Sequence, residues 1–347
     1  MELWVDAIFI VIVALLIDRF MGEVPNAIHP LRWMGNILGW LDRRVKNRAS
    51  GWAHLWGLLS YLLVFCIFWF ISITVCMLVR VKLGDWTSEI GNYTVCWGEI
   101  LWIILCGFFF KISFAVFSFR KHCMPIQKDL REGNTEAAAA KVQMIVSRKT
   151  KGMDAEHIAS SCCETVSENL VDSVCSPTFY FGLLGLTGSV MFRCCNLMDA
   201  MWGYLNDKYR NLGFFPAKFD DVLGFITSRV SPVFVWLAAK LMRMPPHPGI
   251  IEAARRDHAM TPSPNSGWPM TAVAAALGIS MEKKDVYIMG VGSPMPTIDD
   301  VTRCYHLVEL TSILFMIIVT IPLFVFIGIH VEIFAEDLIR GLFGGLI

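Results

Sequence analysis

The sequence predicts an all-α integral membrane protein, a polytopic helical bundle with a polar site that faces the cytoplasm. Three observations predict this class. Of the 347 residues, 55% are hydrophobic and only 17% are charged, whereas soluble domains carry roughly 25% charged residues. Mean hydropathy is +0.54. The apolar residues are gathered in long runs, which is typical of membrane segments.

Three apolar runs are long enough to cross the roughly 30 Å hydrocarbon core of a bilayer, which takes about 20 helical residues. These runs cover residues 53–79, 98–119 and 307–329. Four weaker runs are candidates for tilted, re-entrant or buried segments, at residues 3–17, 178–192, 222–241 and 268–279. We interpret the first weak run as a retained helix, because Glu2 and Asp6 stand where a signal peptide carries basic residues.

The charge pattern predicts an orientation in the membrane. Basic residues are frequent in segments 18–52 and 120–151, whereas segment 80–99 has mixed charge. The positive-inside rule places both basic segments in the cytoplasm. We therefore expect one polytopic domain over residues 1–347, in the plasma membrane and in contact with lipid. It would include a cytoplasmic helical insertion at about 120–172 and an interfacial helix at about 331–347.

Composition also limits the function. The chain has 30 basic and 30 acidic residues, and binding to nucleic acid would need a basic surplus. The 11 cysteines include no C-x-x-C pair. An odd and scattered set argues against a disulfide framework. We interpret the cysteines as small packing residues in a reducing compartment, with metal binding or redox chemistry as the alternatives.

Three acids predict a site on a helix. Glu164, Glu168 and Asp172 are spaced i, i+4 and i+8, and Asn169 lies beside them. At about 100° per residue they share one helix face, where three like charges repel. We expect a cation to compensate them, either Arg, Lys or a divalent metal such as Mg²⁺, which prefers oxygen ligands. A solvated polar face is the alternative.

Four further polar blocks flank the apolar runs. Segment 18–32 is either a site or a set of interfacial anchors. Segment 147–150 combines Arg with hydroxyls, which can bind phosphate, or it is a solvated loop. Segment 196–229 places ionisable residues at the edges of apolar segments, where they are costly and usually functional. Segment 263–269 precedes a small-residue helix and forms either an anion site or a capped turn.

Taken in order, the five blocks resemble the CbiB/CobD family of cobalamin biosynthesis, the adenosylcobinamide-phosphate synthases. The matching positions span residues 18 to 269. They are Asp18-Arg19-x-x-Gly22-Glu23-x-Pro25 with His29-Pro30-x-Arg32; Ser147-Arg148-x-Thr150; Glu164-x-x-x-Glu168-Asn169-x-x-Asp172; Asn196-x-x-Asp199 with Gly203-Tyr204-x-Asn206 and Arg210; Asp220-Asp221 with Arg229; and Ser263-Pro264-Asn265-x-Gly267-Trp268-Pro269. Each piece is short, but the ordered set is specific.

The resemblance implies a membrane-bound ligase that joins aminopropanol, free or phosphorylated, to a propionate carboxylate of adenosylcobyric acid. ATP would drive formation of the amide bond. That chemistry needs Mg²⁺ on the phosphates, basic residues on the transferred phosphoryl group and a base for the amine. Other membrane-associated enzymes of cobalamin assembly are expected partners. The polar residues of all five blocks are expected on the cytoplasmic side.

The resemblance also implies roles for individual residues. We expect catalysis from Glu164, Glu168 and Asp199, and metal binding from Glu168, Asp172, Asp220 and Asp221. We expect binding of substrate or phosphate from Arg19, His29, Arg32, Arg148, Asn169, Asn196, Tyr204, Asn206, Arg210, Arg229, Ser263 and Asn265.

The chain departs from the family pattern at several positions. Lys149, Leu197, Ala200 and Gly224 stand where Asp, Thr, Ser and Asn are usual, and Glu282-Lys283-Lys284-Asp285 replaces a Gly-rich segment. These losses leave a divergent, non-catalytic membrane scaffold or sensor as the alternative function. A transporter is less well supported, because the centres of runs 53–79 and 307–329 carry no acid that could line a pathway.

Overall fold

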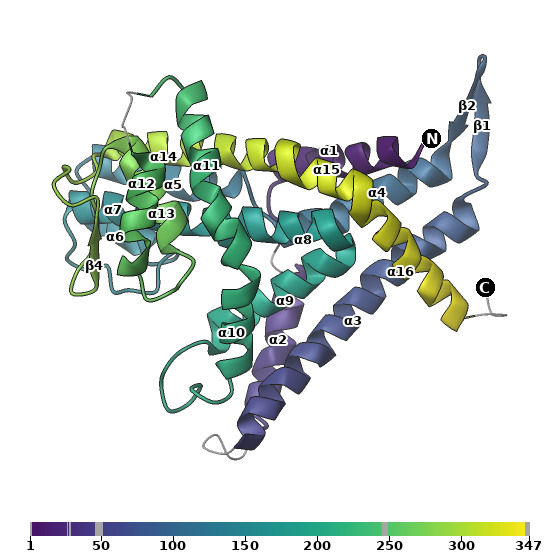
Figure 1. Ribbon diagram of the computed structural model, residues 1–347, viewed down its shortest axis with the longest axis horizontal. Helices are drawn as coiled ribbons and strands as arrows, with labels where there is room; N and C mark the ends of the chain where they lie inside the picture. Colours follow the sequence, from purple (N-terminus) through teal and green to yellow (C-terminus); the bar gives the residue numbers. More distant parts are fainter. Residues whose placement is uncertain (1, 26, 28, 46–50, 245–248, 344–347) are drawn as a thin grey trace. The chain divides into compact units, whose positions relative to one another are not determined.

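The computed structural model describes residues 2–25, 27, 29–45, 51–244 and 249–343 (Figure 1). Helices dominate this part of the chain, and strands occur in it only as two short antiparallel hairpins. Among the described residues, three helices are long and apolar enough to cross a membrane, Gly51–Leu83, Ala155–Trp202 and Ile298–Leu342, or up to five if each of two bent pairs is one span. The predicted all-α membrane class is therefore confirmed.

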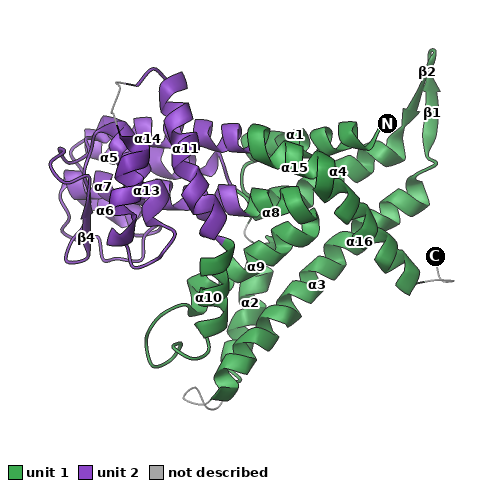
Figure 2. Ribbon diagram, viewed as in Figure 1, with its two compact units in different colours: residues 1–114, 177–223, 317–347 green, residues 115–176, 224–316 purple. Residues whose placement is uncertain are grey.

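The chain divides into two compact units (Figure 2). Unit 1 consists of residues 1–114, 177–223 and 317–347, and unit 2 of residues 115–176 and 224–316. Each unit is assembled from segments that are distant in the sequence. The single domain with a cytoplasmic insertion at about 120–172 stays a prediction.

Unit 1 is built mainly from apolar helices. Its elements are α1 (Leu3–Phe20), α2 (Pro30–Asp42), α3 (Gly51–Leu83), β1 (Thr87–Ile90), β2 (Tyr93–Cys96), α4 (Trp97–Ser113), α8 (Ser176–Leu184), α9 (Leu186–Trp202), α10 (Phe214–Leu223), η3 (Met316–Thr320), α15 (Ile321–Leu323), η4 (Phe324–Gly328) and α16 (Ile329–Leu342). Helices α2, α3 and α9 share buried side chains that include Leu38, Val64 and Trp202. Burial of such side chains stabilises a fold by about 25 cal/mol per Å², so this core holds the ends of α9 and α10 in place.

Unit 2 is built around a short buried helix. Its elements are α5 (Ser118–Arg131), α6 (Thr135–Val142), α7 (Ala155–Leu170), η1 (Val171–Cys175), α11 (Phe225–Leu241), α12 (Ile250–Asp257), η2 (His258–Met260), α13 (Gly267–Leu277), β3 (Met281–Lys283), β4 (Tyr287–Met289) and α14 (Ile298–Phe315). Helices α7, α11, α12 and α14 all pack against α13. The small buried side chains of Ala272, Ala274 and Ala276 allow this close approach.

The strongest predicted spans agree with the helices except at one end. Run 53–79 lies within α3, and run 307–329 lies within the continuous helix Ile298–Leu342. Run 98–119 is wrong beyond Ser113, where α4 ends. Lys111 is buried there, with its Nζ 2.9 Å from Asp18 Oδ1 and 3.3 Å from the carbonyl oxygen of Phe114. Averaging hydropathy along the run hides both the buried charge of Lys111 and the bend that follows Ser113.

The weaker runs are interrupted or short. Run 178–192 lies within the long helix Ala155–Trp202 and is interrupted between α8 and α9 by Gly185, whose φ of 61° lies in the left-handed region that glycine favours. Run 222–241 contains the end of α10, and α11 begins at Phe225. Run 268–279 corresponds to α13, whose 11 residues extend about 16 Å and cannot cross a bilayer.

The two ends of the chain leave two expectations untested. Run 3–17 lies in α1, and its crossing of a membrane stays a prediction. The tail is helical to Leu342 as α16, which continues from η4, and its interfacial position also stays a prediction. Residues 344–347, like residues 46–50 of the first basic segment, lie outside the described part of the chain.

Asp154 begins α7 and provides a test of this helix. Its Oδ1 accepts hydrogen bonds from the backbone N of His157 at 2.9 Å and from the Nδ1 of His157 at 2.7 Å. The backbone bond, then the side-chain bond, lowers the pKa of Asp154 below its ordinary 3.8. We expect Asp154→Ala to lower the free energy of unfolding by about 1 kcal/mol at neutral pH, because a helix cap is lost.

The pH dependence follows from the sign of that shift. The pKa is lower in the folded state than in the unfolded state, so the charged cap stabilises fully above 3.8, and this stabilisation is lost as pH falls through the folded value. Unfolding in detergent at pH 7 and pH 3 should therefore show a smaller difference between wild type and Asp154→Ala at pH 3. Asp154→Asn, which keeps a neutral cap, is the control. A difference that stays constant with pH would contradict this assignment.

Candidate active site

Some of the predicted site residues lie together with neighbouring side chains in three groups. The acidic cluster of unit 1 consists of Asn196, Asp199, Asp220 and Asp221. The Glu164 network of unit 2 consists of Arg148, Ser160, Glu164, Glu282 and Tyr287. The Arg229 group, also in unit 2, consists of Arg229, Ser263, Asn265 and Trp268.

The acidic cluster joins α9 to α10. Asn196 and Asp199 are i, i+3 on α9 and share a helix face. Asn196 Nδ2 donates a hydrogen bond to Asp220 Oδ1 at 3.4 Å. The carboxylate of Asp199 is close enough to those of Asp220 and Asp221 for mutual repulsion. In the part of the chain that the structure describes, Asp199 forms no ion pair.

Two cationic side chains, those of Arg193 and Lys218, lie beside this cluster. Arg193, one turn before Asn196 on α9, donates from Nη1 to Asn196 Oδ1 at 3.0 Å. Lys218 Nζ lies 3.2 Å from Asp221 Oδ2 at the surface. Arg193 also acts on the charge of Asp220. The cluster is therefore partly neutralised, but it retains a local excess of negative charge.

The first polar block lies near these groups within unit 1. His29 caps α2, and its Nδ1 accepts a hydrogen bond from the backbone N of Leu31 at 3.2 Å. Burial lowers the pKa of His29, and the charges of Lys111 and Arg193 lower it further, against the opposing effect of Glu23. The imidazole is therefore neutral at pH 7. It offers an Nε2–H donor to a ligand rather than a positive charge.

Other predicted residues of unit 1 are more exposed. Arg19 and Arg32 are exposed on α1 and α2, and Tyr204, Asn206 and Arg210 are exposed in the loop before α10. Asn206 Oδ1 accepts hydrogen bonds from the backbone N of Lys208 and of Tyr209, both at 3.1 Å. This arrangement is an Asx turn, in which the side chain of Asn206 stabilises the conformation of the loop.

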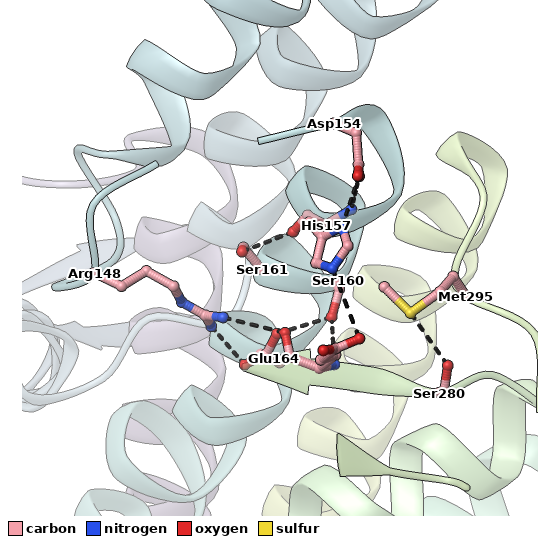
Figure 3. Close-up of polar contacts among 9 residues, drawn as sticks. Arg148, Asp154, His157, Ser160, Ser161, Glu164, Ser280 and Met295 are labelled. Atoms are coloured by element: carbon pink, nitrogen blue, oxygen red, sulfur yellow. Dashed lines mark hydrogen bonds and ion pairs between the residues drawn. The ribbon is translucent and has the colours of Figure 1, made fainter. Parts of the chain in front are cut away.

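Glu164 is the centre of the network in unit 2 (Figure 3). Its side chain is only 2% exposed, and its Oε2 pairs with Arg148 Nη2. Oε2 also accepts a hydrogen bond from the hydroxyl of Tyr287 at 2.7 Å, and Oε1 accepts one from Ser160 Oγ at 2.8 Å. The sequence predicts a cation that compensates the acids of this helix, and at Glu164 that cation is the side chain of Arg148.

The same network fixes the β3–β4 hairpin to α7. Ser160 Oγ accepts a hydrogen bond from the backbone N of Glu282 at 2.9 Å, and Arg148 Nη1 donates to the carbonyl oxygen of Glu282 at 3.3 Å. His157 Nε2 lies 3.7 Å from Glu282 Oε2. The charged segment that replaces a Gly-rich stretch of the family pattern is therefore a hairpin that holds Arg148 and Glu164 in place.

The remaining acids of α7 differ from Glu164. Glu168, one turn further, is exposed and lies within the electrostatic influence of Lys283 and Arg148. Asp172 lies in η1, a π-helical turn, so the uniform spacing assumed for a single helix face does not extend to it. Asn169 bridges the junction, with Nδ2 donating to the Thr165 carbonyl at 2.9 Å and Oδ1 accepting from Ser173 Oγ at 2.8 Å.

The Arg229 group places the end of the fourth block against the fifth block. Arg229 Nη1 donates to Asn265 Oδ1 at 3.2 Å, and its guanidinium lies 5.4 Å from the centre of the Trp268 ring. Ser263 Oγ accepts hydrogen bonds from the backbone N of Asn265 at 3.3 Å and of Ser266 at 3.5 Å. The side chain of Ser263 therefore closes a turn before α13, whose N-cap Ser266 makes no side-chain cap, and both interpretations of segment 263–269 stay predictions.

The sequence motifs assign no role to Lys111, Arg193 or Tyr287. Lys111 could have been found, because a lone charge within an apolar run is usually functional. Arg193 shares a helix face with Asn196. Tyr287 has no local signal, since it lies 123 positions from Glu164. Burial, and then the negative charge of Glu164, raises the pKa of the Tyr287 hydroxyl, so that it stays protonated as a donor.

Comparison with known proteins places the chain in a family. The family model described as CobD/Cbib protein matches residues 11–316. The chain belongs to the CobD/Cbib family. A probable cobalamin biosynthesis protein CobD of Methanothermobacter thermautotrophicus is 34% identical over 88% of this chain and 94% of its own length. The CobD protein of Dehalococcoides mccartyi is 31% identical over 82% of this chain and 87% of its own length.

A third relative, from Thermococcus kodakarensis, is 35% identical and covers 80% of this chain and 83% of its own length. No solved structure matches the chain. Membership of the CobD/Cbib family assigns this membrane protein to cobalamin biosynthesis, a role that implies corrinoid substrates.

Proposed function

We propose that this CobD/Cbib family member is an ATP-dependent amide synthase. It joins aminopropanol or its phosphate to a propionate carboxylate of adenosylcobyric acid. The observation that supports this best is the acidic cluster, in which Asp199 and Asp220 repel one another next to Asn196. A reaction that consumes ATP needs a place of this kind for the cation that accompanies the phosphates.

Mg²⁺ fits the donor set of the acidic cluster, which offers only oxygen ligands from carboxylates and an amide. Among the described residues, these carboxylates are not drawn together into a compact three-ligand group. This suits an ion that is usually held by one or two carboxylates together with phosphates and water. Asp220 and Asp221 would hold it, with Asp199 nearby. When bound, Mg²⁺ would neutralise phosphate charge.

Residues beside the cluster would orient the reactants, and a separate group in unit 2 would bind the substrate. Arg193 fixes the amide of Asn196 through the 3.0 Å hydrogen bond, and the Nε2–H of neutral His29 would donate to a phosphate or a substrate carbonyl. In unit 2, Arg148 keeps N–H donors beyond the two that it uses, and these would bind an anionic group of the substrate. Glu164 would act as a positioning residue, because both its oxygens already accept hydrogen bonds.

Glu168 is the better candidate for the base. It is exposed, whereas Glu164 is buried on the same helix. In the proposed reaction, the γ-phosphoryl group of ATP moves to a carboxylate oxygen of the corrinoid and ADP leaves. The amine then attacks the acyl carbon and loses a proton to Glu168. Inorganic phosphate leaves with the former carboxylate oxygen. Glu168 and Asp172 as metal ligands stay predictions of the family pattern.

The proposal includes a plasma-membrane location with the polar residues facing the cytoplasm, where ATP is available. The scaffold or sensor alternative is based on lost polar side chains. Leu197, one of these positions, packs against the hydrophobic core of unit 1, so a packing role accounts for the change there. Lys149, another of them, is exposed.

A reconstituted assay tests the function. The full chain in detergent or in vesicles would receive adenosylcobyric acid, Mg²⁺–ATP and either aminopropanol or its phosphate. We expect a corrinoid product heavier by the amine less one water, with one ADP per amide, and no product when ATP is omitted. ATP-independent product, or no product with either amine, would contradict the proposal. The preferred amine identifies the substrate.

A further inference from the structure

A second group of ligand atoms in unit 1 lies apart from the residues assigned above. It consists of Cys76 on α3, Cys106 on α4 and Glu332 on α16. One ligand atom from each, the two Sγ atoms and a carboxylate oxygen, lie within 4.8 Å of one another. The three residues are 0%, 1% and 1% exposed, respectively. Three helices that are distant in the sequence therefore bring two thiols and an acid to one buried point.

Only one of the two carboxylate oxygens of Glu332 has a hydrogen-bond partner among the described residues. Its Oε2 accepts a hydrogen bond from the backbone N of Leu186 at 2.7 Å, at the start of α9. Its Oε1 is buried and has no hydrogen-bond partner among the described residues. Glu336, one turn further on α16, is fully engaged by comparison: it accepts from Trp102 Nε1 at 2.8 Å and pairs with Arg80.

The position of the Glu332 carboxylate is built into the fold. Gly185 lies against it, and a Cβ at Gly185 would come within 2.4 Å of Oε2. The φ of Gly185, 61°, also disfavours a side chain there. The backbone therefore holds the carboxylate in one place next to two thiols, although an unpaired buried carboxylate is costly. A cation at this point would remove that cost.

We propose that Cys76, Cys106 and Glu332 bind a zinc ion that joins α3, α4 and α16. Two thiolates and a carboxylate are ligands that zinc accepts, at about 2.3 Å from sulfur and about 2.0–2.2 Å from oxygen. A tetrahedral site places these three ligand atoms about 3.5–3.8 Å apart, a spacing within the observed limit of 4.8 Å, and leaves the fourth position to water. Binding replaces the two thiol protons, which pass to water. Because the group is buried, the ion has a structural role.

Metal binding by the purified full chain tests this proposal without any substrate. Reduced protein would be loaded with Zn²⁺ and desalted, and metal would be counted per chain; Co²⁺ loading would report sulfur ligands through the thiolate-to-cobalt charge-transfer absorption. We expect about one tightly held ion per chain, the charge-transfer band, and a higher melting temperature with zinc. Cys106→Ser and Glu332→Gln should reduce binding, and Cys66→Ser, which changes an exposed cysteine of α3, should not.

If a variant fails to fold, the absorption spectrum of the cobalt-loaded wild type still decides the test. Absence of the charge-transfer band from cobalt-loaded wild type would overturn the proposal. Equal zinc binding by folded Cys106→Ser would also overturn it, because the ion would then be held elsewhere. A folded Glu332→Gln variant that binds zinc as tightly as wild type would remove the carboxylate from the site and contradict the three-ligand assignment.

Discussion

Asp199→Asn should lower the rate of ATP-dependent amide formation by about 100-fold or more, equivalent to about 2.7 kcal/mol in the activation barrier. Asp199, like Asp220, forms no ion pair in the described part of the chain, whereas Asp221 pairs with Lys218, so the charge of Asp199 is available to Mg²⁺–ATP. Asparagine keeps nearly the same shape but removes that charge. The measurement is kcat in the reconstituted assay as a function of Mg²⁺ concentration, where a metal role predicts that higher Mg²⁺ restores part of the rate.

Asp207→Asn is the matched control for this substitution. Asp207 is an exposed acid in the loop that follows α9, and it belongs to none of the three groups. We expect its rate to stay within about twofold of wild type. An Asp199→Asn enzyme with wild-type kcat at every Mg²⁺ concentration would remove the acidic cluster from the reaction.

Arg148→Ala should lower the free energy of unfolding by about 3–5 kcal/mol, because it leaves a buried carboxylate without its cation. The side chains of Arg148 and Glu164 are 16% and 2% exposed, so solvent can do little to replace the lost charge. Tyr287→Phe removes one donor from the same oxygen and should cost less, about 1–3 kcal/mol. Equilibrium unfolding in mixed micelles measures both changes.

The double variant Arg148→Ala/Glu164→Gln separates lost charge from lost packing. It has no buried charge at this point, so we expect it to be more stable than Arg148→Ala alone. Glu156→Gln, an exposed acid in the first turn of α7, should change stability by less than about 0.5 kcal/mol. A double variant less stable than Arg148→Ala would contradict the assignment of Glu164 as the unpaired charge.

The fold could be predicted from the sequence where one physical signal dominates. The long apolar run at residues 53–79 has no competing feature, and it lies within α3. Run 98–119 failed because Lys111 makes a buried ion pair with Asp18, a residue 93 positions away, which a local average cannot include. The hairpin of β3 and β4 was also missed, because its pairing with α7 depends on contacts between segments that are distant in the sequence.

The sequence predicted which residues belong to the site better than it predicted how they are arranged. The family motifs name Asn196 and Asp220, which the structure joins by a hydrogen bond. They do not show that Glu164 is buried and paired whereas Glu168, four residues later, is exposed. Helical spacing puts both on one face, and only tertiary packing by Arg148 and Tyr287 distinguishes them. The same packing moves Glu164 from a candidate base to a positioning residue.

The most direct test of the central claim is the fate of the oxygen atoms of the corrinoid carboxylate. Adenosylcobyric acid labelled with ¹⁸O in the reacting propionate would be converted with Mg²⁺–ATP and the amine that supports the reaction. If ATP activates that carboxylate, one labelled oxygen must appear in the inorganic phosphate, and none in ADP, as the amide forms. Amide formation with no ¹⁸O in the phosphate would contradict an ATP-driven synthase of this kind.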